Sequence, residues 1–221
     1  MIITLDGPAG SGKSTVARKI AAQLQIAYLD TGAMYRAVAW KCLQEGVDLA
    51  DHDRIIEITR DSRITLDCGP TYTRVALNGQ DVSEAIRSME TNQATSFVAR
   101  LPGVRRLLVE HQRCIGAELG SLVSEGRDQG SVVFPNADAK FVLDAAIEKR
   151  AERRFHEMCA DGIDLTFEQV LENLRLRDGN DQCQWAPLLE PGQAVIIDTS
   201  KLRIDEVVEV LLDHVKEACN H

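Results

Sequence analysis

The stretch "GPAGSGKST", residues 7–15, decides how the amino end of this chain folds. It follows "MIITLD", residues 1–6, an apolar run rich in β-branched side chains that is typical of a buried strand. After it, "STVARKIAAQLQ" carries apolar residues at helical spacing. A glycine-rich turn between a strand and a helix, with the pattern G-x-x-x-x-G-K-[ST], lets backbone N–H groups and a helix N-terminus bind phosphate. The sequence therefore predicts a nucleotide-binding loop.

Two side chains of this loop have separate tasks. Lys13 is expected to reach the β- and γ-phosphates of ATP, and the Ser14 hydroxyl to ligate Mg²⁺. The alternative is a flexible glycine-rich turn that matches the pattern by chance, which the flanking strand and helix argue against. The residues expected to bind the nucleotide are Gly7, Pro8, Ala9, Gly10, Ser11, Gly12, Lys13, Ser14 and Thr15.

The composition is that of an acidic globular protein. The 221 residues carry a net charge of -9, with a pI of about 5.1, which argues against a general nucleic-acid or membrane-surface binder. No apolar run approaches the roughly 20 residues that span a bilayer, and the first residues are not expected to act as a signal peptide, because they lack a basic segment followed by an apolar one. The six cysteines include no C-x-x-C pair, which predicts reduced thiols rather than a zinc site or disulfides. We expect a cytoplasmic protein.

Several classes of nucleotide-binding protein lack support in this sequence. Switching GTPases need a guanine-reading N-K-x-D, which is absent, and no strand ends in D-x-x-G. A motor or transporter ATPase would have an apolar strand that ends in an acidic residue. The nearest match is "SLVSEGRD", residues 121–128, where Arg127 suits a second anionic substrate better than a bare metal site.

A second anion site is indicated by "YLDTGAMYR", residues 28–36. A strand passes into a helix here, so backbone N–H groups, the Thr31 hydroxyl and the Arg36 guanidinium converge near Asp30. The alternative is an ordinary helix with a threonine cap and a solvated arginine. The motif alone leaves both interpretations open.

Strands and helices alternate along the chain, which predicts an α/β fold with a five-stranded parallel sheet flanked by helices. Ligands are expected at the carboxyl ends of the strands, where the phosphate loop, Asp30 and Arg127 fall. The strands are predicted at residues 1–6, 26–30, 121–125, 140–144 and 194–198.

Two segments interrupt this α/β order. Residues 63–82 contain two alternating runs around a turn, which predicts a hairpin in an inserted subdomain at about 63–100. Two charged helices at about 148–184 are predicted to form a lid. The core of the single domain then comprises residues 1–62, 101–147 and 185–221.

Five motifs together resemble a known family. "GPAGSGKST", "LDTGAMYR", "DVSEAIR", "EGRDQGSVVFP" and "LRDGNDQ" occur in the order found in bacterial cytidylate kinases, which are nucleoside monophosphate kinases with a P-loop. The resemblance covers essentially the whole chain. It implies an enzyme that transfers the γ-phosphoryl group of ATP to CMP or dCMP with Mg²⁺. It also implies an enlarged insertion for the monophosphate, a lid that closes over the substrates and a monomer.

The resemblance assigns roles residue by residue. The arginines matching those that contact the CMP phosphate are Arg36, Arg127 and Arg177. The residues matching the cytosine-binding set are Ser96, Arg105 and Asp128, and Asp181 matches the aspartate that holds the ribose. We expect Asp30 and Thr31 to line the same substrate site. The lid arginines that would close over ATP are Arg150, Arg153 and Arg154, with a solvated helix face as the alternative. The expected catalytic residues are Lys13, Arg127, Arg177 and Arg153.

One position departs from the family pattern R-D-x-x-D-x-x-R. The last arginine is Gln184 here, which lacks the charge and the bidentate fork. Two rivals therefore stay open: a kinase of another small anionic acceptor, and a nucleotide-binding regulatory protein without turnover.

Restoring the arginine tests this departure. The variant Gln184→Arg is expected to lower the KM for CMP, because a guanidinium adds a charged donor near the ribose and phosphate. Steady-state kinetics with varied CMP measure the effect. An unchanged KM would show that another group already compensates for the missing arginine.

Overall fold

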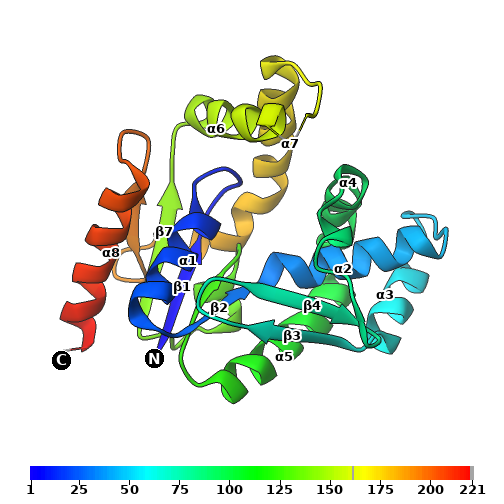
Figure 1. The fold of residues 1–221 in the computed structure, drawn as a ribbon, viewed down its shortest axis with the longest axis horizontal. Helices are drawn as coiled ribbons and strands as arrows, with labels where there is room; N and C mark the ends of the chain where they lie inside the picture. Colours follow the sequence, from blue (N-terminus) through cyan, green and yellow to red (C-terminus); the bar gives the residue numbers. More distant parts are fainter. Residues whose placement is uncertain (161, 220–221) are drawn as a thin grey trace. The chain divides into compact units, whose positions relative to one another are not determined.

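The five predicted strands form one sheet in the order β2-β6-β1-β7-β8. This computed structural model of the protein describes residues 1–160 and 162–219 (Figure 1). The pairs β1–β7 and β7–β8 are parallel, with Leu5 opposite Phe141 and Val142 opposite Ile196. The predicted parallel sheet flanked by helices is thus confirmed. The chain forms two compact units, residues 1–24 with 123–221, and residues 25–122.

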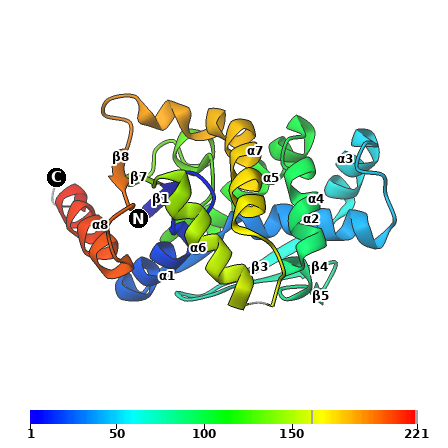
Figure 2. The same ribbon diagram turned by 90° about the horizontal axis from the view of Figure 1, so that it is seen from above.

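The first unit contains the P-loop and both predicted lid helices. Its elements are β1 (Ile2–Asp6), α1 (Lys13–Leu24), β7 (Ala139–Asp144), α6 (Ile147–Ala160), α7 (Phe167–Trp185), β8 (Val195–Asp198) and α8 (Ile204–Cys219), with β6 (Leu122–Glu125) starting at the unit boundary. A π-helical turn at Gln129–Val133 and a 3₁₀ turn at Ala186–Leu189 complete it. Helix α8 lies beside α1, and α6 beside α7 (Figures 1 and 2).

The second unit carries the predicted hairpin. Its elements are β2 (Ala27–Asp30), α2 (Thr31–Gln44), α3 (His52–Asp61), β3 (Ile64–Cys68), β4 (Thr73–Leu77), β5 (Gln80–Asp81), α4 (Met89–Val98) and α5 (Pro102–Leu119), with a 3₁₀ turn at Ala85–Arg87. Strands β3, β4 and β5 form an antiparallel sheet, so the hairpin prediction is confirmed.

Side-chain burial explains the central strands. Ile3 and Leu5 point to one face of β1, Thr4 and Asp6 to the other, and all four are fully buried. Strand β1 is therefore covered on both faces, as is usual for a central strand of a parallel sheet, and its second face buries two polar residues.

Helix α3 was not predicted from the sequence. Asp51 caps it by accepting a hydrogen bond from the Arg54 N–H at 3.0 Å, and Ile55 and Ile58 are buried. Helix α5 begins at Pro102, because proline suits the first position of a helix. Residues 99–101 separate it from α4.

One threonine of the hairpin holds the end of β2. The Thr73 hydroxyl donates to the Tyr28 carbonyl at 2.6 Å and accepts from the Asp30 N–H at 3.2 Å. Thr73 is 7% exposed, so neither backbone group has water as a ready substitute. The hairpin therefore helps to fix the backbone of Asp30, one of the predicted substrate residues.

The variant Thr73→Val tests this link. It keeps the shape of the side chain but removes one hydrogen bond from each of two backbone groups, which is expected to cost about 1–3 kcal/mol of unfolding free energy. For a chain of this size, each 1 kcal/mol lowers Tm by about 2–4 °C. The control is Thr65→Val on the exposed face of β3. Equal melting temperatures for the two variants would contradict the proposed link.

Candidate functional site

The P-loop has the backbone that its glycines predict. Gly7, Gly10 and Gly12 have φ angles of 126°, 76° and 94°, a region that disfavours other residues. A Cβ atom at Gly7 would collide with the carbonyl oxygen of Leu143 at the end of β7. The loop is therefore seated directly on the neighbouring strand, which leaves no room for a side chain at its first position.

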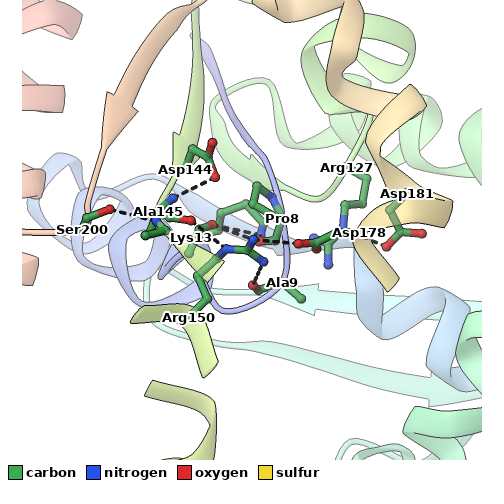
Figure 3. A network of polar contacts seen from close by, with 12 residues as sticks. Pro8, Ala9, Lys13, Arg127, Asp144, Ala145, Arg150, Asp178, Asp181 and Ser200 are labelled. Atoms are coloured by element: carbon green, nitrogen blue, oxygen red, sulfur yellow. Dashed lines mark hydrogen bonds and ion pairs between the residues drawn. The ribbon is translucent and has the colours of Figure 1, made fainter. Parts of the chain in front are cut away.

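Lys13 lies inside this loop rather than in solvent. Its Nζ donates to the Pro8 carbonyl at 2.6 Å (Figure 3) and to the Ser11 hydroxyl at 3.4 Å. The Ser11 hydroxyl also donates to the Pro8 carbonyl, at 3.0 Å. Lys13 is 5% exposed, so its charge depends on protein groups rather than on water. Ser14 and Thr15 are exposed at the start of α1.

Two arginines act on the charge of Lys13. Burial, then Arg127, and more weakly Arg177 lower the pKa of Lys13 to about 7, while Glu125 and Asp6 oppose the shift. Burial and Arg127 likewise lower the pKa of Arg177 to about 10. Arg127 forms an ion pair with Asp181, Nε to Oδ2 at 3.3 Å (Figure 3). The buried Nε of Arg177 has no hydrogen-bond partner among the described residues. A buried cationic N–H group without a hydrogen-bond partner favours an anionic ligand.

The π-helical turn after β6 is held by a carboxylate of β1. Asp6 accepts from the backbone N–H groups of Gln129 and Gly130 at 2.7 and 2.8 Å. Burial raises the pKa of Asp6 to about 6 despite these two bonds. The turn fixes Asp128, whose carboxylate accepts from the Gln129 side-chain amide at 3.3 Å and is 3% exposed. The Asp128 carboxylate is thereby held in a rigid frame.

The three lid arginines of α6 differ in their surroundings. Arg150 is buried and paired with Asp178 on α7, Nη2 to Oδ2 at 2.7 Å (Figure 3). Arg153 donates to the carbonyl and the hydroxyl of Thr199 at 2.6 and 3.1 Å. Arg154 is more exposed and pairs with Glu157 at 3.0 Å. The solvated-face alternative therefore does not describe Arg150, and the catalytic role predicted for Arg153 stays a prediction.

The second unit holds its own arginine site. Asp30 caps α2 by accepting from the Ala33 N–H at 3.0 Å, and its other oxygen accepts from Arg36 Nη2 at 2.6 Å. A Cβ atom at Gly32 would lie 3.0 Å from Arg36 Nη1. The missing side chain at this position therefore leaves room for the guanidinium over the first turn of α2. The buried Nε of Arg36 has no hydrogen-bond partner among the described residues. Thr31 is buried at the first position of α2.

Arg87 joins this site and was missed from the sequence. Its Nη2 lies 4.0 Å from Asp30 Oδ2, and its side chain is 54% exposed. The motif "DVSEAIR" ends at this arginine, so the signal was present. Ser96 lies on α4, where its hydroxyl donates to the Gln93 carbonyl at 2.8 Å, and Arg105 lies half-buried on α5.

Gln184 lies near the end of α7, half-buried. Its backbone carbonyl accepts from the Ser131 hydroxyl at 2.9 Å. This bond ties α7 to the π-helical turn through the main chain, independently of the side chain at position 184. Glutamine instead of arginine at position 184 therefore does not remove this contact between α7 and the π-helical turn.

The described residues give the protein few ligands for a metal ion of its own. Among them, no group of three or more His, Cys, Asp and Glu side chains is arranged to hold one. The described part of the chain also has no helix both long and apolar enough to cross a membrane. The described cysteines are free thiols: Cys42, Cys68, Cys114, Cys159 and Cys183.

Comparison with known proteins identifies close relatives. The model of the cytidylate kinase family matches residues 3–217. A cytidylate kinase of Caldanaerobacter subterraneus subsp. tengcongensis is 46% identical over 216 residues, covering 97% of this chain and 94% of that protein. Another from Clostridioides difficile is 43% identical, covering 97% and 98%. A bifunctional pantoate ligase/cytidylate kinase of Thermosynechococcus vestitus is 46% identical over 96% of this chain but only 42% of that protein.

Solved structures agree on the fold. A protein from Eubacterium ventriosum has a TM-score of 0.53 at 13% identity, covering 98% of each chain. Shikimate kinase from Acinetobacter baumannii has a TM-score of 0.50 at 14% identity, covering 98% of this chain and 93% of that one. The predicted fold and the predicted resemblance are both confirmed.

The lowered pKa of Lys13 makes ATP binding sensitive to pH. Near pH 8 a lysine with a pKa of about 7 is mostly uncharged, and a phosphate anion raises that pKa. Binding is therefore expected to take up as much as about one proton near pH 8, and none through Lys13 well below its pKa. Calorimetric titration in buffers of different ionisation enthalpy measures this uptake.

The matched controls are Lys13→Arg, which stays charged, and Lys19→Arg on the exposed face of α1. The first is expected to abolish the proton uptake and the second to leave it unchanged. ATP binding without proton uptake in the unmodified protein would contradict the assignment.

Proposed function

We propose which residues of the chain carry out each part of its reaction. The chain belongs to the cytidylate kinase family and transfers the γ-phosphoryl group of ATP to CMP or dCMP. Phosphoryl transfer needs positioning and charge stabilisation more than covalent chemistry. The proposal therefore rests on the positively charged side chains described above. Its main support is that Arg127 and Arg177 lower the pKa of Lys13 and that Arg127 lowers the pKa of Arg177.

The P-loop is proposed to bind the phosphates of ATP. Its glycines give the backbone the turn that aims N–H groups inward, and the first turn of α1 adds its dipole. Lys13 is proposed to leave the Pro8 carbonyl for the β- and γ-phosphates, since an anionic oxygen is a stronger acceptor than a peptide carbonyl. Arg153 is proposed to act on the same nucleotide.

Arg127 and Arg177 are proposed to stabilise the phosphoryl group in transfer. Burial and the charge of Arg127 lower the pKa of Arg177 in the free protein, and negative charge between donor and acceptor would offset this effect. Asp181 partly neutralises Arg127 and is proposed to hold the ribose hydroxyls. No general base is required, because the attacking oxygen of CMP is already anionic near pH 7.

The acceptor phosphate is proposed to bind Arg36, with Arg87 as a second donor. The Nη2 of Arg36 donates to Asp30, which orients the side chain. Its Nε has no hydrogen-bond partner among the described residues, so a donor remains for the phosphate. Thr31 and Asp30 are proposed to shape this site at the start of α2. We expect Arg36→Ala and Arg87→Ala to raise the KM for CMP and not that for ATP; equal effects on both would contradict this assignment.

The cytosine base is proposed to be read by Ser96, Arg105 and Asp128. A carboxylate accepts from the cytosine amino group, which uracil lacks, so Asp128 would disfavour UMP. The buried position of Asp128 supports this role, because a base without the amino donor would leave the carboxylate one hydrogen bond short with little water to replace it.

Mg²⁺ is proposed to bind through the Ser14 hydroxyl and the phosphates of ATP. Ser14 is exposed at the start of α1, and Mg²⁺ commonly takes few protein ligands and keeps phosphates and waters. Bound there, the ion would neutralise charge on the phosphates. The monomeric state and the cytoplasmic location stay predictions from the sequence.

The variant Arg177→Ala tests the proposal. It is expected to lower kcat for CMP by about 10²–10³, the usual cost of losing a donor to transition-state charge. The control is Arg175→Ala, an exposed arginine on the same helix. A coupled assay of ADP formation with CMP, dCMP, UMP, AMP and GMP measures both. A normal kcat for Arg177→Ala would remove that residue from the reaction.

A further inference from the structure

Arg150 is a buried cation whose donors are all directed into the protein. Its side chain is only 6% exposed. Nε donates to the Ala145 carbonyl at 2.9 Å, Nη1 to the Ala9 carbonyl at 3.2 Å, and Nη2 pairs with Asp178 at 2.7 Å (Figure 3). One planar guanidinium thus joins the end of β7, the P-loop and α7.

The P-loop is built closely against Arg150. A Cβ atom at Gly10 would lie 3.1 Å from the Arg150 carbonyl oxygen and 3.2 Å from its Cβ. The Ala9 methyl packs against the apolar cluster of α6 and α7, which contains Ala151, Val170 and Leu174. Packing and hydrogen bonding therefore both hold the loop against the two helices.

Asp178 lies on α7 between Arg177 and Asp181, the two residues of this helix to which roles are proposed above. It directly follows Arg177, and Asp181 comes one turn later. On the same inward stripe, Val170, Leu174 and Trp185 are buried, so apolar contacts fix the helix at both ends of this polar segment. The Arg150–Asp178 pair is the polar anchor in the middle. The pair therefore restrains the rotation of α7, the helix that carries Arg177.

We infer that Arg150 and Asp178 are positioning residues, which set α7 so that Arg177 faces the phosphates held by the P-loop. Arg150 does so through the same side chain that bonds the loop carbonyl of Ala9. It therefore links the position of Arg177 to the conformation of the P-loop. The inference rests on the role proposed above for Arg177.

A double-mutant cycle tests this inference. The variant Asp178→Asn keeps the shape of the side chain and removes its charge. It is expected to lower kcat by about tenfold to a hundredfold through misplacement of Arg177. In Arg177→Ala there is nothing left for Asp178 to position. The double variant should therefore match Arg177→Ala within about twofold rather than show the product of both losses.

The matched control is Glu172→Gln, which removes an exposed carboxylate from the same helix and is expected to leave kcat unchanged. All rates are compared below the temperature at which each variant begins to unfold. A merely structural role for Asp178 would lower Tm while leaving kcat, or would give multiplicative losses with Arg177→Ala. Either result overturns the inference.

A second variant covers the case in which Asp178→Asn does not fold. Arg150→Lys keeps the buried charge but loses the planar fork, so one ammonium cannot serve three acceptors on separate segments. It is expected to show the same loss of kcat, again without further effect on Arg177→Ala. An unchanged rate for Arg177→Ala alone would contradict the proposed function. A normal rate for Arg150→Lys beside an impaired Arg177→Ala would contradict only the positioning role.

Discussion

Repulsion between positive charges is the constraint on which the first unit depends. Burial lowers the pKa of Lys13, and the charges of Arg127 and Arg177 lower it further. Burial and Arg127 also lower the pKa of Arg177. Carboxylates limit that cost without removing it, because Asp6 and Glu125 favour the charge of Lys13 and Asp181 pairs with Arg127. The protein thus keeps three cationic side chains close together, an arrangement that a bound anion would stabilise. Such preorganisation is what phosphoryl transfer requires, since the donors need not be assembled during the reaction.

Features set by local chemistry could be predicted from the sequence. The P-loop follows from glycines at fixed spacing between a strand and a helix, and Gly7 shows why, since its Cβ would strike Leu143. The five core strands were found because buried parallel strands are continuous apolar runs. The hairpin was found because β3 and β4 alternate around a turn. In each case the sequence pattern that predicts the structure lies within a few residues.

Features set by distant neighbours were not predictable in the same way. Helix α3 was missed because its short polar segment hides only two deeply buried isoleucines, Ile55 and Ile58. Arg150 could not be told from Arg153 and Arg154, since all three lie in one charged run and only packing against the P-loop separates them. The contact of Arg87 with Asp30 joins residues 57 positions apart, which periodicity does not reveal. The assignment of Ser96 and Arg105 came from resemblance alone.

The fit of Arg150 behind the P-loop also has an evolutionary consequence. Positions 9 and 10 of the loop vary in the general motif, because the phosphate contacts only their backbone. In this fold a second requirement acts on them from the protein side, where Gly10 meets the Arg150 backbone and Ala9 meets its guanidinium. A larger residue at either position would have to be matched by changes at positions 150 and 178. Substitutions in the loop and the lid of such enzymes are thus expected to arise as correlated sets rather than singly.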